Sequence, residues 1–444
     1  MKMRYLHIAI LLPIVMVLTA CERFLDIKPV GSVIPENEEQ YRALLTNAYS
    51  RFPTDRGLAM FRSDEVQLNA ADSYSEASYL DIYTWNDNAP SDYTASFQWK
   101  DYYHIIYLAN HIIEELADAD GLTPAMEQMV GEAYCLRAYA HFTLVCLFAP
   151  PYADSTLNAP AVPLSMNTDT ETTLSRSTVA QVYASVEADI ASAMQYLNAP
   201  RWTGTLAYRW SVQAAWAFRS RLYLYMARWN EAIGAAQQAL VLGGTLLDLN
   251  RSRAVAPAHH TSPECIQALD FVITADYLKA ARPSGDIMAL FDPTGDLRFL
   301  NLTVRETAAG DYAIAADGSP AYRTTFRVGE LYLSMAEAHV RLGNTAAARD
   351  TLLTLKRNRL DAATFATDST RMATIDAQEQ LLDEVLNERA RELAFQGHRW
   401  FDLRRTSQQQ LIHRYNGAIH RLNRADARYT IPIPKEAREG NANL

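Results

Sequence analysis

A short pattern of large and small residues constrains the fold of this chain most strongly. The pattern lies within residues 213–241 and consists of Trp216, Tyr223, Ala232 and Ala239, at offsets 0, 7, 16 and 23. Two antiparallel helices approach closely only where one presents a small side chain to the ring of the other. This order of large and small residues therefore predicts a tight helical hairpin.

A weaker copy of the pattern follows within residues 327–357. It keeps the hairpin but loses the aromatic residue and the last alanine, and its positions are Leu331, Ala338, Ala347 and Thr354. The spacing is that of the 34-residue tetratricopeptide repeat. Helical periodicity at 97–148 and 179–228 predicts further hairpins. Fewer than four clean repeats indicate a decorated helical scaffold and not a pure solenoid.

Two stretches lose the helical period, and we expect both to be loop-rich insertions. Residues 56–96 carry Asp, Asn, Ser and many aromatic residues, and residues 243–326 carry repeated Gly and Pro with a β-like run. Long irregular segments in compact proteins usually have a function. We predict a single body, 21–444, whose parts are an N-terminal part (21–200), a hairpin (201–242), an insertion (243–326) and a C-terminal hairpin with its terminal block (327–444).

The N-terminus predicts export and lipidation. Two basic residues precede an apolar run, and Leu18-Thr19-Ala20 leads into Cys21. This order is typical of a secretory signal over residues 1–20. It resembles a bacterial lipobox, which implies a lipid on Cys21. Because the apolar run is shorter than the roughly 20 residues that span a bilayer, we expect an anchored protein and not a membrane helix.

Charge and motifs narrow the class of function. The net charge is -10, which argues against nucleic acid as a partner. The sequence has no nucleophile elbow, zinc-protease motif, P-loop or dinucleotide fingerprint, and Cys135, Cys146 and Cys265 lack zinc spacing. We therefore expect a protein that is not an enzyme and has no metal or cofactor. A glycosidase carboxylate pair has no sequence signature, so a surface glycoside hydrolase stays an alternative.

The C-terminal block resembles a known family. The run Glu388–Arg405 resembles the C-terminal signature of the SusD/RagB family, which are nutrient-uptake lipoproteins of the starch-utilisation type. Further matches occur in order along the chain at 161–164, 295–298, 327–338 and 429–434. Gln396 departs from the signature, since an acid is common there, and the tail after Ile433 lacks the usual asparagine-proline ending.

The resemblance implies a fold, a location and a partner. The implied fold is mainly α, with tetratricopeptide-like hairpins that form a right-handed helical scaffold bearing loop-rich insertions and a few short strands. The implied location is the cell outer membrane, where a lipid-anchored member lies as a lid over a TonB-dependent, SusC-like transporter. Members bind glycans or, in some cases, peptides, and structural calcium is not indicated here. A protein-only helical adaptor is a further alternative, although it would not need long aromatic loops.

The charged residues of the signature block are interpreted as structural. The helical period sets Arg389 in an apolar stripe, and a buried guanidinium needs an acid from another helix, for which Glu330 and Glu337 are the candidates. The other members of this predicted packing lock are Glu392, Arg399, Trp400 and Asp402.

Candidate ligand-binding residues lie in the two insertions. A sugar chain binds to flat apolar rings and to short polar groups. Residues 74–93 offer both without a helical period, and we predict contacts from Tyr83, Trp85, Asn86, Asp87, Asn88 and Tyr93. The second insertion adds Tyr277 and Arg282 as weaker candidates.

Overall fold

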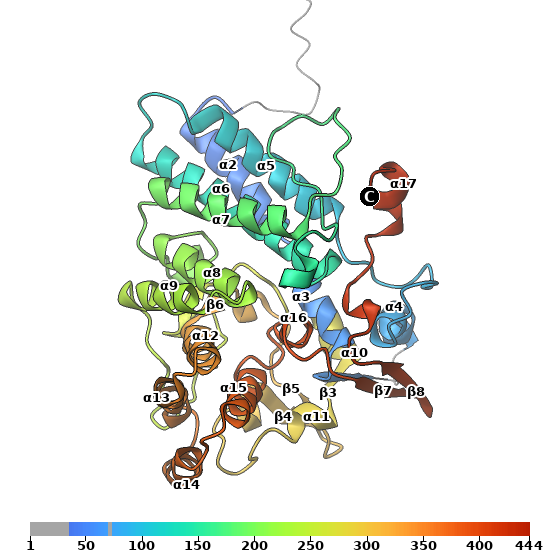
Figure 1. Cartoon of the computed structure of the whole chain (residues 1–444), viewed down its shortest axis with the longest axis vertical. Helices are drawn as coiled ribbons and strands as arrows, with labels where there is room; N and C mark the ends of the chain where they lie inside the picture. The colour runs from blue at the N-terminus through green and yellow to red at the C-terminus, as the bar shows by residue number, and fades with distance from the viewer. Residues whose placement is uncertain (1–34, 70–72) are drawn as a thin grey trace, which may run out of the picture. The chain divides into compact units, whose positions relative to one another are not determined.

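Helices dominate residues 35–69 and 73–444, which are the residues that the structure, a computed structural model, describes (Figure 1). The helices are α2 (Glu38–Ser50), α3 (Asp55–Leu58), α4 (Ser73–Tyr83), α5 (Lys100–Leu116), α6 (Pro124–Phe148), α7 (Val179–Tyr196), α8 (Val212–Tyr225), α9 (Trp229–Val241), α10 (Ala275–Ala280), α11 (Gly285–Met288), α12 (Val328–Arg341), α13 (Thr345–Arg357), α14 (Ala362–Ala373), α15 (Gln378–Glu392), α16 (Arg399–Arg405) and α17 (Lys435–Gly440). None of these helices is both long and apolar enough to cross a membrane. The predicted signal segment and Cys21 lie outside the described residues.

The long helices begin at the residues that their sequences favour. Thr178 accepts a hydrogen bond from the backbone of Gln181, whose side chain accepts one from the backbone of Thr178, so α7 opens with a capping box. The Thr123 side chain caps α6 by accepting a hydrogen bond from the backbone of Met126, with Pro124 at the first position of the helix. These local contacts fix where the helices of the hairpins begin.

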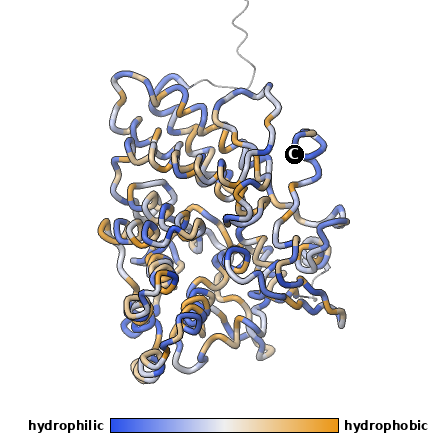
Figure 2. The backbone as a smooth tube through the Cα atoms, in the orientation of Figure 1, coloured by the Kyte–Doolittle hydropathy of each residue, from blue (hydrophilic) through white to orange (hydrophobic). Residues whose placement is uncertain are grey.

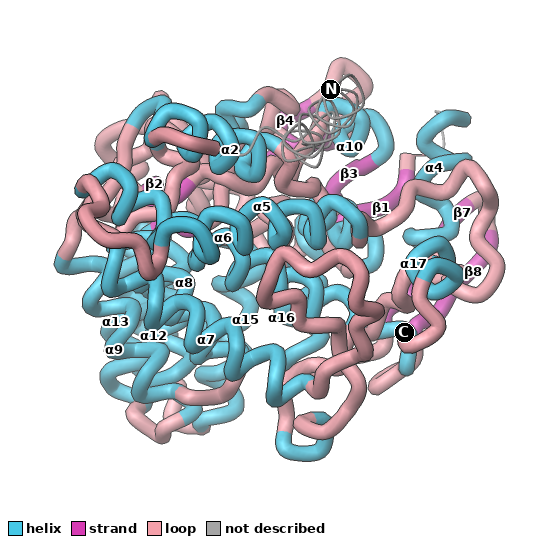
Figure 3. The backbone as a smooth tube through the Cα atoms, turned by 90° about the horizontal axis from the view of Figure 1, so that it is seen from above, coloured by secondary structure: helices cyan, strands magenta, loops and turns pink. Residues whose placement is uncertain are grey.

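Helices that follow one another in the chain pack side by side, which confirms the predicted fold class. Within residues 42–444, α6 packs against α5 and α7, α9 packs against α8 and α12, and α12 packs against α13 and α15. Figure 3 shows these helices gathered on one side and the strands β1, β3, β7 and β8 together on the other.

The apolar faces of the C-terminal helices form one core cluster. Leu333, Leu352 and Leu381 come from α12, α13 and α15 and are at most 1% exposed. Hydrophobic and hydrophilic residues alternate along these helices in Figure 2, as amphipathic helices around a shared core require.

The second hairpin has a register one residue later than predicted. The first hairpin turns at Ala227 (φ 56°) and the second at Gly343 (φ 78°). The backbone hydrogen bonds that close the turns make His339 the counterpart of Tyr223. The structural equivalents are therefore Tyr332, His339, Ala348 and Leu355, and the predicted set of Leu331, Ala338, Ala347 and Thr354 was wrong.

The strands are short and pair in antiparallel couples. They are β1 (Val66–Leu68), β2 (Cys265–Gln267), β3 (Ala281–Pro283), β4 (Val304–Glu306), β5 (Tyr312–Ile314), β6 (Phe326–Arg327), β7 (Leu411–Tyr415) and β8 (Ala418–Leu422). The pairing of β1 with β3 sets Gln67 opposite Arg282 and so joins the two insertions. Residues 56–96 are more ordered than predicted, because the helix α4 crosses them. Serine occupies two of its buried positions, which hid the helical period.

The signature block is a buried network of ion pairs, as its structural interpretation predicts. The Glu392 carboxylate lies 2.6–2.9 Å from guanidinium nitrogens of Arg298, Arg327 and Arg359, and all four side chains are buried. These three arginines come from outside α15. The network therefore ties the second insertion and the segment just after α13 to the end of α15.

The partner of Arg389 differs in part from the prediction. Its Nε donates to Asp402 of α16 at 2.8 Å, while Glu330 of α12 lies farther away, at 3.9 Å. Glu337 pairs with Arg405 instead, so its assignment to Arg389 was wrong. The chain between α15 and α16 reverses at Phe395, which has a positive φ of 59°. This reversal brings Asp402 of α16 to Arg389 of α15.

Trp400 and Arg399 of the signature block also pack against segments that are distant in the sequence. The Trp400 ring is 1% exposed and stacks on Tyr429 at a centroid distance of 5.1 Å. Arg399 forms a two-point ion pair with Asp64 of the first insertion. Both contacts are packing contacts between distant segments.

Candidate functional site

The segment that follows α4 folds around one carboxylate, that of Asp81. This side chain accepts hydrogen bonds from the Ser91 backbone (2.7 Å), the Thr94 hydroxyl (2.6 Å) and the Asn86 amide (2.8 Å). Partial burial acts to raise the pKa of Asp81, but these donors hold it below its usual value. An ionised Asp81 therefore joins Asn86, Ser91 and Thr94 of the loop over residues 86–96.

Two open hollows lie on either side of this loop and share the residues Asp81 and 86–88. One hollow, of about 750 Å³, has its far wall on the β7–β8 hairpin, at Asn416, Ala418 and His420. The other, of about 610 Å³, has its far wall on the extended tail 431–434 and the start of α17. Volumes of this size suit small oligomeric ligands. We define the loop 86–96 and these two hollows as the candidate site.

Trp85 and Tyr83 are buried, and this burial argues against their predicted role as ligand contacts, although Trp85 is among the residues that line the larger hollow. Their side chains are 1% and 2% exposed, and each ring stacks on His413 of β7 with centroids 4.1 Å apart. The Trp85 indole donates to the carbonyl of Arg62 at 3.0 Å. The aromatic residues of this segment are core because the hairpin, far along the chain, covers them.

The predicted polar residues and Tyr93 do lie at the site. Asn86 and Asn88 are exposed and line both hollows. Asp87 lines both as well, but its carboxylate is paired with Arg62 at 2.7 and 2.8 Å. Tyr93, on the same loop, is 79% exposed. Whether they contact a ligand stays a prediction.

The structure treats the two weaker candidates of the second insertion differently. Tyr277 is 7% exposed and packs edge-on against Phe61 and Tyr79, so its ring belongs to the core. Arg282 is half-buried, and one of its guanidinium nitrogens donates to backbone carbonyls at the end of α10, including that of Leu278. Whether Arg282 contacts a ligand stays a prediction.

Sequence reasoning missed the residues that form the far wall of the larger hollow. Asn416, His420 and Arg428 follow the signature block and carry no motif. The two-residue spacing Asn416-Gly417 between alternating residues is a hairpin signal and could have placed them together. Sequence reasoning also missed a half-buried ring group in the second insertion, where Tyr322 lies against His259 at 5.5 Å.

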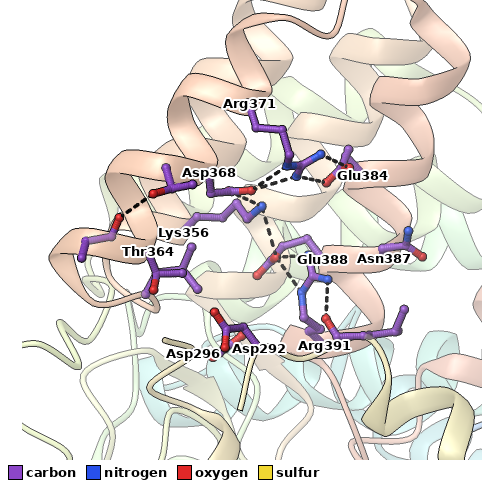
Figure 4. A pocket seen from close by; sticks show the side chains of 14 residues that line it. Asp292, Asp296, Lys356, Thr364, Asp368, Arg371, Glu384, Asn387, Glu388 and Arg391 are labelled. Atoms are coloured by element: carbon purple, nitrogen blue, oxygen red, sulfur yellow. Dashed lines mark hydrogen bonds and ion pairs between the residues drawn. The ribbon is translucent and has the colours of Figure 1, made fainter. Parts of the chain in front are cut away.

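A third hollow, of about 560 Å³, lies between α14, α15 and the loop 290–296. Figure 4 shows that its charged side chains face one another. Arg371 bonds Asp368 and Glu384, and Lys356 lies 2.6 Å from Asp368. No aromatic residue is among those that line it. Its charges are satisfied within the protein, so we place the candidate site at the loop 86–96.

The chemistry of the candidate site is that of binding. The exposed Asn88 amide can accept from and donate to hydroxyl groups, and the Tyr93 ring offers a flat face to C–H groups. Asn86 offers only its amide oxygen, because its nitrogen donates to Asp81 and to the carbonyl of Ala89. Among the described residues, no group of three or more His, Cys, Asp or Glu could hold a metal ion. Cys135 and Cys146 are buried and free, and burial raises the pKa of both thiols.

Comparisons with known proteins agree with this architecture. A family model described as "Starch-binding associating with outer membrane" matches residues 23–224, and the SusD family model matches residues 304–444. SusD-like protein P38 of Formosa agariphila is 24% identical over 476 residues, covering 88% of this chain and 89% of that protein. The two family models together match most of the chain, and the chain belongs to the SusD/RagB family.

Solved structures show the same fold. A SusD superfamily protein from Bacteroides fragilis superposes with a TM-score of 0.75 at 22% identity, covering 93% of this chain and 100% of that one. A laminarin binding SusD-like protein superposes with a TM-score of 0.59 at 20% identity, covering 84% and 92%.

Proposed function

We propose that this chain is a cell-surface glycan-binding protein that captures oligosaccharides at the loop 86–96. The observation that carries the proposal is the loop itself, which is hydrogen-bonded to Asp81 at three residues and borders two hollows, while Asn86, Asn88 and Tyr93 are exposed. The description of the matched family as starch-binding and the laminarin-binding relative support a glycan as the ligand.

We propose further that the chain is anchored through a lipid on Cys21 at the outer membrane and serves as the lid of a TonB-dependent transporter. The lipobox-like sequence before Cys21 and the family's association with the outer membrane support this. A capturing lid holds its ligand by a few contacts of modest strength and performs no reaction on it. The open hollows are consistent with such a role.

Calorimetric titration with laminarihexaose, maltohexaose and a hexapeptide, followed by chromatography of each mixture, tests the glycan proposal. We expect one of the glycans to bind the purified protein, the peptide not to bind, and every ligand to be recovered intact. Asn88→Ala should weaken glycan binding, because it removes an exposed amide from both hollows. Binding of the peptide alone, or hydrolysis of any ligand, would overturn the proposal.

A further inference from the structure

His413 of β7 lies between two aromatic rings of the first insertion. The rings of Tyr83 and Trp85 stack on it with centroids 4.1 Å away in each case, at interplanar angles of 14° and 26°. Two rings that are this close and this nearly parallel must cover opposite faces of the imidazole. The residue is 4% exposed. Aromatic faces carry partial negative charge and attract a cation, most strongly where water is excluded, so this slot favours a charged imidazole.

Both ring nitrogens of His413 meet backbone carbonyl groups of the same insertion. Nδ1 lies 2.6 Å from the Tyr83 oxygen, and Nε2 lies 2.8 Å from the Ser63 oxygen. A carbonyl oxygen only accepts, so each bond needs an N–H on the ring. A neutral imidazole has one N–H, and a charged imidazolium has two. Both bonds therefore exist together only when His413 is charged, and a neutral ring leaves one buried carbonyl without a donor.

The charged and titratable groups around this ring act in both directions. Burial, with a smaller effect of His420 across the hairpin, lowers the pKa of His413 to about 4, while the two carbonyl bonds and Asp64 act to raise it. Asp64 is itself paired with Arg399 of α16. The Tyr83 phenol is uncharged at neutral pH, because burial raises its pKa to about 12. The charged ring is the state in which both carbonyl groups of the slot have a donor.

The hairpin that carries His413 forms the far wall of the larger hollow. The hairpin residues that line this hollow are Tyr415, Asn416, Ala418 and His420. His413 is the middle residue of the buried side of β7, between Leu411 and Tyr415. Its two bonds join the hairpin to the first insertion at Ser63 and at the end of α4. The number of these bonds therefore affects how firmly the wall is seated.

We propose that His413 is a proton-dependent latch for the wall of the candidate site. With both ring nitrogens protonated, His413 binds both carbonyl groups and seats the hairpin. With one proton lost, one bond is lost and the hairpin loosens. By linkage, the seated hairpin then holds the second proton more tightly than a loosened hairpin, in which histidine titrates at about 6.5. Mild acid therefore strengthens the wall and alkaline pH weakens it. The effect on ligand binding rests on the proposed function.

Nitrogen-15 NMR of the histidine rings in the purified protein tests the protonation state directly. The variant His413→Gln identifies the signals of His413 by their loss. At pH 5.5 we expect both ring nitrogens of His413 to carry a proton. One unprotonated nitrogen at pH 5.5, which is the result if burial prevails over the two bonds and the two rings, would overturn the inference.

Hydrogen exchange of the β7 and β8 amides measures the seating of the hairpin. From pH 5.5 to pH 8.5, protection corrected for the intrinsic exchange rate should fall about 10-fold in the wild type, since one pKa unit of difference between the two hairpin states is a tenfold change in seating. His420→Gln is the matched control, because it removes the other histidine of the hairpin and should keep this fall. In His413→Gln the fall should disappear. Equal protection of the wild type at both pH values, or a fall that persists in His413→Gln, would overturn the latch.

Calorimetry with laminarihexaose and maltohexaose at the same two pH values separates the latch from the proposed function. We expect the wild type to bind glycan up to about 10-fold more tightly at pH 5.5 than at pH 8.5, because the apparent affinity scales with the seated fraction. His413→Gln should bind equally at both. If neither glycan binds at either pH, the proposed function fails, while NMR and exchange still decide the latch. Equal glycan affinity of the wild type at both pH values would overturn the latch and leave the glycan proposal standing.

Discussion

At the scale of single residues, tertiary contacts and not the local sequence decide whether an aromatic residue such as Trp85 belongs to the core. Sequence reasoning assigned Trp85 to the ligand surface and Trp216 to the hairpin core. In the structure Trp85 is 1% exposed against His413, whereas Trp216 is half-buried beneath Arg219. A contact between Trp85 and β7 spans most of the chain, and no local pattern encodes it.

Trp85→Ala should therefore destabilise the protein strongly. Removing a buried aromatic side chain costs about 3–5 kcal/mol, because the transfer free energy is lost and a cavity remains. Tyr93→Ala, at 79% exposure, should change the free energy of unfolding by less than about 0.5 kcal/mol. Denaturant titration of the two variants measures both values. Equal stability of Trp85→Ala and wild type would contradict the assignment of this ring to the core.

A buried histidine should make the protein sensitive to mild acid. Burial, with the neighbouring Arg137 charge, lowers the pKa of His141 to about 3, whereas an unfolded histidine titrates near 6.5. Between these values the unfolded state binds the extra proton, so the contribution of His141 to stability is present above pH 6.5 and is lost as the pH falls. At pH 5 the loss is about 2 kcal/mol.

The variant His141→Gln isolates this contribution. The free energy of unfolding should fall less steeply between pH 7.5 and pH 5 in the variant than in the wild type, whatever the offset between the two curves. Curves with equal slopes for the variant and the wild type would contradict the prediction. They would show that unfolding does not add a proton to His141 in this pH range.

At the scale of elements, sequence predicted the existence of helices better than their register. The helices of both hairpins follow from their 3.6-residue periods. The register error in the second hairpin arose because Ala338 and Ala347 mimic the small positions, while the turn at Gly343 fixes the true ones. The helix α4 was missed since its buried side includes Ser75 and Ser78.

The ion pairs of Glu392 hold the end of helix α15 against Arg298, Arg327 and Arg359. Glu392→Gln keeps the shape of the side chain but leaves three buried guanidinium groups without this carboxylate, and breaking such a buried pair costs about 3–5 kcal/mol. Glu379→Gln on the exposed start of the same helix is the control and should be neutral. Thermal and denaturant unfolding compare the two. A neutral Glu392→Gln would show that the network does not hold the insertion to α15.

At the scale of the whole molecule, sequence predicted the class of scaffold and part of the site. The sequence predicted Asn86, Asn88 and Tyr93 as candidates because the local composition of residues 74–93 indicates a polar loop. The walls of the hollows were not, because the hairpin at 411–422 and the tail at 431–434 reach the loop only through the tertiary fold.

The proposed lipid anchor on Cys21 concerns the whole molecule, and only the sequence supports it. Cys21→Ala should prevent labelled palmitate from entering the protein and should move it from the membrane fraction to the soluble fraction. The physical reason is that the lipid would be the proposed attachment, since none of the described helices is long and apolar enough to cross a membrane. Equal labelling of wild type and variant would contradict the prediction.

The affinity of the Tyr93→Ala variant for the bound glycan tests the central claim most directly. Loss of one stacking ring should cost about 1–3 kcal/mol, which is a 5- to 150-fold rise in Kd. Tyr107→Ala is the matched control, since Tyr107 is 38% exposed and lies on α5, outside the loop 86–96. Calorimetry should show the rise for Tyr93→Ala alone, with the thermal stability of both variants unchanged. Unchanged affinity in Tyr93→Ala, or equal losses in both variants, would contradict the account of the loop 86–96 as the glycan site.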